Sequence, residues 1–193
     1  MMAADYPHRV RIIGGEWRRR WLDVPAGLAV RPTPDRVRET LFNWLAPRLI
    51  GARCLDLFAG SGVLGLEALS RGAATVTLID HDPAVIAGLH HNATRVGASN
   101  ARIVQSDAAH YLSNPVPASF HVVFVDPPFT SGLAIPTLTL LKPWLTTDGV
   151  VYLETPIEST DIPLPEGWRI MRDSTTRQTQ YRLLEYAPMG AAD

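Results

Sequence analysis

Short apolar runs alternate with amphipathic stretches over most of the chain after residue 52. The apolar runs predict β-strands, and the stretches between them have the spacing or composition of helices. The predicted strands are 53–58, 75–80, 101–105, 120–126 and 149–154, and the predicted helices are 63–71, 83–96 and 133–145. Strands that alternate with helices predict a parallel sheet covered by helices on both faces.

The two ends of the chain follow other patterns. Residues 168–172 and 180–186 are strand candidates joined by a short polar run, which predicts an antiparallel hairpin at the end of the sheet. Near the front, residues 9–13 and 19–24 flank Gly14-Gly15 and predict a small two-stranded ribbon. An extended, proline-containing stretch and one amphipathic helix connect this ribbon to the alternating region.

Charge divides the chain in a similar way. The net charge is -1, but residues 1–50 hold nine arginines against five acidic residues, whereas the remainder holds nine basic against fourteen acidic residues. An arginine-rich front and an acidic body indicate that the front meets a polyanion. We therefore expect a basic ribbon and extended arm over residues 1–40 and one folded domain over residues 41–193.

The remaining composition excludes several classes of protein. Hydrophobic residues make up 46% of the chain and charged residues 19%, which is typical of a globular protein. Cys54 is the single cysteine, so no internal disulfide is expected, and no segment approaches the ~18 apolar residues of a membrane span. The histidines lack the spacing of a metal site. We expect a cytoplasmic protein without a metal.

A glycine-rich segment joins the first strand of the alternating region to the helix that follows. It runs from Asp56 to Gly65, and Gly60, Gly62 and Gly65 have the spacing of a dinucleotide-binding loop. Glycines let a ligand approach the backbone, and a helix start offers free N–H groups. The loop alone leaves a nicotinamide cofactor open.

Three acidic residues favour a cationic cofactor instead. Asp56 and Asp80 lie at the ends of the first two predicted strands, and Asp107 follows the third. Asp56 could face the ammonium group of a methionine moiety but would repel a pyrophosphate. Asp80 is placed to bind ribose hydroxyls, and Asp107 to accept a hydrogen bond from an adenine amino group. The alternative is that Asp80 and Asp107 only cap loops and that the glycines only form a turn.

The fourth predicted strand runs directly into Asp126-Pro127-Pro128-Phe129. An aromatic amine is a poor nucleophile because its lone pair is delocalised, so an enzyme that methylates it must orient it. Asp126 and a main-chain carbonyl near Pro127 can accept both amine hydrogens, and the prolines stiffen the loop without donating. Phe129 offers a face for base stacking. An ordinary tight turn is the alternative.

These motifs follow the order found in amino-methyltransferases, and RPTPDRVRETLFNWL (31–45) closely resembles the signature of the bacterial RsmD family. The similarity extends from IIGGEWR (12–18) to YRLLEY (181–186). The resemblance implies an S-adenosylmethionine-dependent enzyme that methylates the 2-amino group of one guanine in 16S ribosomal RNA. It implies an α/β, Rossmann-like class I methyltransferase fold, here with a C-terminal antiparallel hairpin and an N-terminal β-ribbon extension.

The resemblance also assigns roles to individual residues. The family more often has Glu at the ribose-binding position, where this chain has Asp80. The implied cofactor-binding residues are Asp56, Phe58, Ala59, Gly60, Ser61, Gly62, Asp80, Asp107 and Ala108. The implied catalytic residues are Asp126, Pro127, Pro128 and Phe129.

The implied partner is 16S ribosomal RNA or the assembling small ribosomal subunit, and we expect the protein to act as a monomer. The target guanine must be unpaired or flipped for its 2-amino group to reach Phe129. We expect the basic front to supply RNA affinity through phosphate contacts. The arginines expected to contact RNA are Arg9, Arg11, Arg18, Arg19, Arg20, Arg31 and Arg38.

Three other functions stay open. The tetrapeptide also fits a DNA adenine or cytosine amino-methyltransferase, although no region is large enough for a separate sequence-reading domain. A non-catalytic ribosome-assembly factor that binds RNA would keep its cellular effect without Asp126. A nicotinamide oxidoreductase is the third, and cofactor-binding calorimetry distinguishes it.

Overall fold

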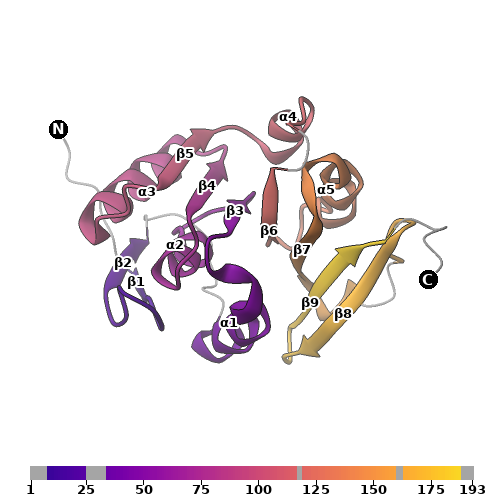
Figure 1. Cartoon of the computed structure of the whole chain (residues 1–193), viewed down its shortest axis with the longest axis horizontal. Coiled ribbons are helices and arrows are strands. Elements are labelled where there is room, and N and C mark those ends of the chain that lie inside the picture. The colour runs from indigo at the N-terminus through magenta and orange to yellow at the C-terminus, as the bar shows by residue number, and fades with distance from the viewer. Residues whose placement is uncertain (1–7, 25–33, 117–118, 160–162, 188–193) are drawn as a thin grey trace.

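The computed structural model describes residues 8–24, 34–116, 119–159 and 163–187. Within these segments one large sheet has the strand order β5-β4-β3-β6-β7-β9-β8, and β1 and β2 form a separate ribbon (Figure 1). The strands of the large sheet are β3 (Arg53–Asp56), β4 (Thr75–Asp80), β5 (Ala101–Gln105), β6 (Phe120–Val125), β7 (Leu145–Pro156), β8 (Trp168–Thr175) and β9 (Thr179–Tyr186).

The sheet is parallel from β5 to β7 and is completed by an antiparallel hairpin. The central strand β3 pairs in parallel with β4 on one side and with β6 on the other, and β6 pairs in parallel with β7. Strand β9 lies antiparallel to both β7 and β8. The predicted fold class is therefore confirmed. The strand order reverses between β3 and β6, and α/β sheets bind ligands at the carboxyl ends of strands at such a point.

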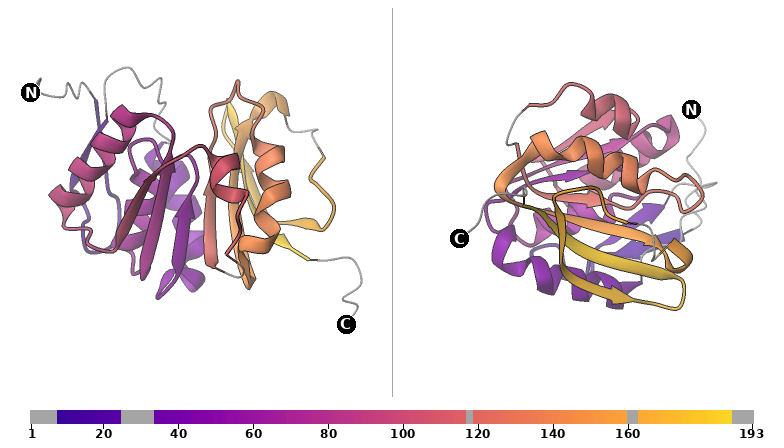
Figure 2. Two further views of the ribbon diagram at one scale, coloured as in Figure 1. Left: turned by 90° about the horizontal axis from the view of Figure 1, so that it is seen from above. Right: turned by 90° about the vertical axis from the view of Figure 1, so that its right-hand side faces the viewer.

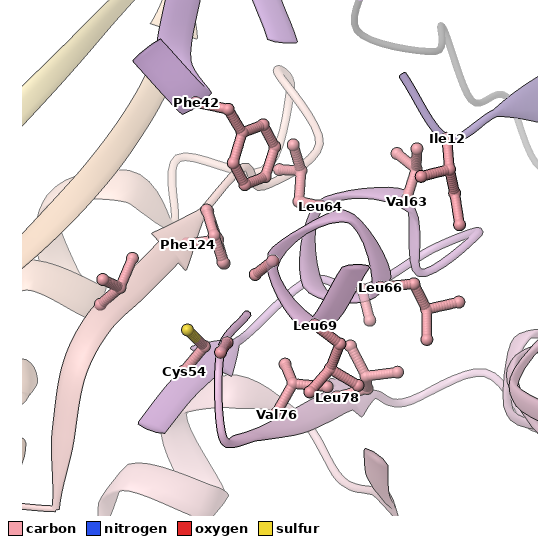
Figure 3. Close-up of a cluster of buried hydrophobic side chains, with 14 of the residues drawn as sticks. Ile12, Phe42, Cys54, Val63, Leu64, Leu66, Leu69, Val76, Leu78 and Phe124 are labelled. Atoms are coloured by element: carbon pink, nitrogen blue, oxygen red, sulfur yellow. The ribbon is translucent and has the colours of Figure 1, made fainter. Parts of the chain in front are cut away.

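Helices cover both faces of the sheet (Figure 2). Side chains alternate between the faces along each strand, which creates two hydrophobic clusters. Phe124 of β6 joins the cluster on one face, where Figure 3 shows it near Phe42 and Leu64, whereas Val123 and Val125 join the other. The first face carries α1 (Asp35–Leu49), α2 (Val63–Ser70) and α3 (Pro83–Val96), and the second carries α4 (Ala108–Leu112), α5 (Ala134–Leu141) and the 3-10 turn η1 (Lys142–Trp144). A further 3-10 turn, η2 (Ile157–Ser159), follows β7.

Several element boundaries differ from the sequence prediction, most of all between α5 and β7. The predicted helix 133–145 ends at Leu141, because the chain tightens into η1 around Pro143, and β7 begins at Leu145 instead of residue 149. The short helix α4 was not predicted. It is capped by Asp107, so a residue expected to bind cofactor also starts a helix.

The N-terminal ribbon packs against the helices of the first face. Its strands β1 (His8–Arg11) and β2 (Trp21–Val24) are antiparallel, and their buried apolar side chains join the first hydrophobic cluster. The side chain of Asn92 in α3 forms two hydrogen bonds with the backbone of β2. It accepts the Asp23 N–H at 2.9 Å and donates to the Asp23 carbonyl at 2.9 Å. The ribbon therefore shares the core of the main domain.

The turn of the ribbon is longer than the pattern around Gly14-Gly15 predicts. It is closed by hydrogen bonds from the Ile12 N–H to the Arg20 carbonyl and from the Arg19 N–H to the Ile12 carbonyl. Arg19 adopts a positive φ of 71°, so it lies within the turn and not on the return strand.

The expected division after residue 40 falls inside α1, and it remains a proposal about roles within one fold.

Candidate active site

The carboxyl ends of β3, β4 and β6 bring three predicted site residues to one edge of the sheet. Asp56, the last residue of β3, is in register with Leu78 of β4 and with Phe124 of β6. Asp80 ends β4 and Asp126 follows β6, each two residues beyond the residue that is in register with Asp56. Asp56 therefore lies deeper in the crevice than the other two carboxylates.

The glycine loop between β3 and α2 depends on backbone angles that glycine favours. Gly60 has a φ of 51° and Gly62, at the start of α2, has a φ of 79°. The Gly60 N–H donates to Asp80 Oδ2 at 3.1 Å, which ties the loop to the end of β4. A Cβ atom built on Gly60 would meet nothing within 4 Å, so this part of the backbone is open to a ligand.

Asp56 is a buried carboxylate with one unpaired oxygen. It is 1% exposed, and its Oδ2 accepts the Gly65 N–H at 3.2 Å, whereas Oδ1 has no hydrogen-bond partner within the described segments. Burial raises the pKa of Asp56 to about 7; the Gly65 and Phe58 N–H groups oppose this rise, and the Asp80 charge adds to it. A buried carboxyl group with a free acceptor suits a cationic ligand group such as an ammonium.

Asp80 and Asp107 each accept a hydrogen bond from the backbone of their own loop, and their carboxylates have further acceptor positions for a ligand. Asp80 Oδ1 accepts the Asp82 N–H at 3.1 Å, and Asp107 Oδ1 accepts the His110 N–H at 2.8 Å at the start of α4. Each carboxylate has about four acceptor positions, so neither side chain is saturated. The other predicted cofactor-binding side chains are the half-buried Phe58 and the buried Ala59, Ser61 and Ala108.

The tetrapeptide 126–129 forms the loop that leaves β6. Pro127 is buried, whereas Phe129 is 40% exposed and presents its ring for stacking. The Pro128 carbonyl accepts hydrogen bonds from the Ser131 N–H at 2.9 Å and the Ser131 hydroxyl at 2.6 Å, which uses both of its lone pairs. The geometry therefore favours the Pro127 carbonyl, beside Asp126, as the main-chain acceptor for an amine.

A pocket of about 440 Å³, its open mouth included, lies beside the tetrapeptide. One wall is the loop that begins at Pro127, and the other includes the end of β7 and Arg182 of β9. Two charged residues that line it, Glu154 and Arg182, are only 5% and 3% exposed, and the Tyr152 hydroxyl donates to Glu154 Oε2 at 2.7 Å. The motifs did not identify these residues, although each is a charge directly beside apolar residues of its strand.

The exposed arginines expected to bind RNA differ in how their charges are compensated. Arg18 and Arg19 lie exposed on the turn of the ribbon. Arg20 is exposed too, but it donates to a main-chain carbonyl of α3 at 3.0 Å. Arg9 and Arg11 each form an ion pair with an aspartate, at 2.9 and 2.7 Å. Arg18 and Arg19 are therefore the strongest candidates for phosphate contacts.

Arg38 corrects the sequence prediction. Its side chain is fully buried: Nη1 donates to the Arg11 carbonyl at 2.8 Å, Nη2 pairs with Asp35 at 2.6 Å, and Nη1 lies 3.7 Å from Glu67. A buried guanidinium is tolerated only when such partners compensate it. Arg38 therefore joins the ribbon to α1 and α2, and it does not face RNA. Arg31 lies outside the described residues.

Three further observations concern other kinds of site. Within the described ranges, no group of three or more His, Cys, Asp or Glu residues could hold a metal ion. None of the helices in those ranges is long and apolar enough to cross a membrane. Cys54 is a buried free thiol, and burial raises its pKa to about 12, so it is not a reactive cysteine.

The chain is similar to known proteins over nearly its whole length. Residues 10–185 match the family described as conserved hypothetical protein 95. The chain is 47% identical over 187 residues to ribosomal RNA small subunit methyltransferase D of Escherichia coli strain K12, covering 96% of this chain and 94% of that protein. The Haemophilus influenzae protein of the same name is 43% identical over 183 residues, covering 91% of this chain and 93% of its own.

A solved structure gives the same result for the fold. Escherichia coli yhhF, described as a candidate methyltransferase, has a TM-score of 0.84 and 46% sequence identity, and the match covers 93% of this chain and 99% of that one. The similarity includes both the glycine loop and the tetrapeptide within residues 10–185. The chain therefore belongs to the family of ribosomal RNA small subunit methyltransferase D, the RsmD family.

Proposed function

We propose that this chain transfers a methyl group from S-adenosylmethionine to the 2-amino group of a guanine in 16S ribosomal RNA. It acts as a monomer in the cytoplasm, on the RNA or on the assembling small subunit. The observation that carries the proposal is the position of residues 126–129 at the end of β6, directly beside the strand that carries the glycine loop. The names of the relatives support ribosomal RNA as the substrate. The family resemblance supports the guanine 2-amino group as the methylated atom.

Residues around the glycine loop would hold the cofactor. The unpaired Oδ1 of Asp56 suits the ammonium of the methionine moiety, Asp80 suits the ribose hydroxyls, and Asp107 with Ala108 suits the adenine. The open backbone at Gly60 permits close approach. When bound, S-adenosylmethionine supplies an electrophilic methyl group.

The tetrapeptide would orient the amine. Asp126 and the Pro127 carbonyl accept its two hydrogens, which frees the nitrogen lone pair from the ring and directs it toward the methyl group. The amine becomes cationic as it is methylated, so Asp126 receives a proton afterwards and needs no strong basicity. Stacking on Phe129 contributes about 1–3 kcal/mol, and orientation supplies most of the rate.

The raised pKa of Asp56 predicts that cofactor affinity increases with pH. Below pH 7 the carboxyl group of the free protein is mostly protonated, whereas a cationic ligand favours the ionised form. The dissociation constant for S-adenosylmethionine, measured by calorimetry, should be about tenfold larger at pH 6 than at pH 8. Asp56→Asn should remove this tenfold difference. The pH dependence of the dissociation constant that remains in this variant should come only from the titration of the ligand amine. An unchanged pH dependence in Asp56→Asn would show that Asp56 does not face the ammonium.

The same shift affects stability in the opposite direction. The folded protein holds the Asp56 proton more tightly than the unfolded chain, whose carboxyl group has a pKa near 3.8. This group therefore stabilises the free protein at acidic pH and loses that contribution as the pH rises through about 7. Cofactor binding and apo-protein stability should consequently respond to pH with opposite signs.

The turn of the ribbon predicts a salt-dependent RNA affinity. Arg18→Ala combined with Arg19→Ala should reduce the slope of log affinity against log salt by about 1.4 for single-stranded RNA, because each phosphate contact contributes about 0.7. Filter binding to 16S RNA at several salt concentrations measures the slope. Arg169→Ala is the matched control, because Arg169 is an exposed arginine on β8 at the far edge of the sheet. A slope equal to that of the wild type would remove the ribbon from the RNA interface.

The proposed function is tested by following the methyl group. The protein is incubated with radiolabelled S-adenosylmethionine and small ribosomal subunits from cells that lack the endogenous methyltransferase, in parallel with naked 16S RNA and duplex DNA. Digestion should release the label as 2-methylguanosine. Label in DNA adenine or cytosine would identify a DNA enzyme, and cofactor binding without transfer to any substrate would favour an assembly factor.

A further inference from the structure

Arg182 lies on the same face of the sheet as the last residue of β6. Val125 is in register with Leu153 of β7, and Leu153 is in register with Arg182 of β9. Residues in register point to the same face, and neighbouring strands are about 4.8 Å apart, so the Cα atoms of Val125 and Arg182 are separated by roughly 10 Å. The tetrapeptide begins at the next residue after Val125. Arg182 thus stands across the pocket from the catalytic loop.

The guanidinium of Arg182 has few partners for a buried charge. It is 3% exposed, and Nη2 donates to Thr155 Oγ1 at a long 3.3 Å, whereas Nε has no hydrogen-bond partner. None of the ion pairs found among the described residues includes Arg182. Burial lowers the pKa of Arg182, and the charge of Asp173 opposes that shift. An uncompensated buried donor costs stability, so this side chain suits a ligand that brings acceptors.

The pocket walls favour a flat base over a phosphate group. Pro127, Leu133 and Ile135 contribute apolar surface, and both Phe129 and Leu133 are 40% exposed. A phosphate would bring four oxygens, most of which would lie against these apolar side chains without donors. A purine has two apolar faces and carries its acceptors on its edges.

We propose that this pocket receives the target guanine and that Arg182 binds its O6 and N7 edge, which makes Arg182 the residue that selects guanine. The inference rests on the proposed function and deepens it. Arginine paired with O6 and N7 is the commonest specific contact to guanine. With the 2-amino group held by Asp126 and Pro127, the O6 and N7 acceptors extend away from the tetrapeptide, toward β9. A purine with a 6-amino group would place donors against the Arg182 donors and be rejected.

The test compares guanosine with 2,6-diaminopurine riboside, which keeps the 2-amino group and N7 but carries a 6-amino donor in place of O6. Each nucleoside is introduced by splinted ligation at the position in 16S RNA where the wild-type protein deposits label, and kcat/KM is measured on reconstituted subunits. The wild type should prefer guanosine by at least ~100-fold. Arg182→Met should reduce this preference to below ~10-fold, mainly through lost activity on guanosine.

For a second variant, Arg182→Gln, we expect a gain of activity on the diaminopurine substrate. A merely structural role of Arg182 could not produce this gain. Glutamine pairs with the 6-amino group and N7 of adenine, so Arg182→Gln should methylate the diaminopurine substrate faster than the wild type does. Arg172→Met is the control, because Arg172 is exposed on the neighbouring strand β8. Calorimetry with S-adenosylmethionine and thermal unfolding show whether each variant is folded.

The outcomes separate this inference from the proposed function. A wild type that methylates both substrates equally overturns the role of Arg182 without any variant. An equal loss of activity on both substrates in Arg182→Met, with no gain of activity in Arg182→Gln, also overturns this role and means that Arg182 only maintains the structure of the pocket. In that case, methylation of guanosine by the wild type leaves the proposed function intact. Only the absence of guanine methylation in the wild type contradicts the proposed function itself.

Discussion

Replacing Asp126 with alanine should lower kcat for methyl transfer by about 10³-fold, because the amine loses the acceptor that orients it. The dissociation constant for S-adenosylmethionine should change less than about twofold, since Asp126 follows β6 whereas the cofactor residues follow β3, β4 and β5. Single-turnover transfer to small ribosomal subunits measures the first quantity, and calorimetry measures the second. Loss of turnover with retained cofactor binding is the result that identifies an enzyme.

Two variants calibrate this result. Asp126→Asn keeps one acceptor oxygen but introduces an amide donor toward the amine, so its kcat should lie between those of the wild type and Asp126→Ala. Asp148→Ala removes an exposed carboxylate from β7 and should leave kcat unchanged. If Asp126→Ala kept kcat within tenfold of the wild type, the tetrapeptide would be only a tight turn and the assembly-factor interpretation would gain support.

The position of the candidate site was predictable because of a rule of sheet geometry. Alternating strands and helices predict a parallel sheet, and a parallel sheet gathers the carboxyl ends of its strands at one edge. Asp56, Asp80 and Asp126 are far apart in the sequence, yet each lies at or near the end of a predicted strand. Their convergence at the ends of β3, β4 and β6 follows from that pattern alone.

Side-chain burial was not predictable from the same pattern. Composition counts an arginine as basic surface, but Arg38 points inward from α1 and Arg182 lies inside the sheet. Periodicity could have given a signal, because both stand where an apolar residue is expected: Arg38 is one residue after Val37 on the buried face of α1, and Arg182 is followed by Leu183 and Leu184. What the sequence does not contain is the identity of their partners, which come from distant elements.

Glu67 is a partner of Arg38, and it connects the N-terminal ribbon to the main domain. Its side chain is fully buried in α2. Oε2 accepts the Ile13 N–H at 2.7 Å, and Oε1 accepts both the Gly14 N–H and Arg71 Nε at 2.7 Å. Because Arg38 lies 3.7 Å away, the carboxylate also offsets the charge of a fully buried cation.

Glu67→Ala should therefore lower the free energy of unfolding by about 3–5 kcal/mol, since it leaves Arg38 without this anion and two backbone N–H groups without acceptors. Urea unfolding monitored by tryptophan fluorescence measures the loss, and Glu39→Ala, an exposed carboxylate on α1, should change it by less than about 0.5 kcal/mol. Hydrogen exchange should show faster exchange at Ile13 and Gly14 in Glu67→Ala alone. A variant that unfolds within about 1 kcal/mol of the wild type and keeps those amides protected would mean that apolar packing, not the buried carboxylate, holds the ribbon in place.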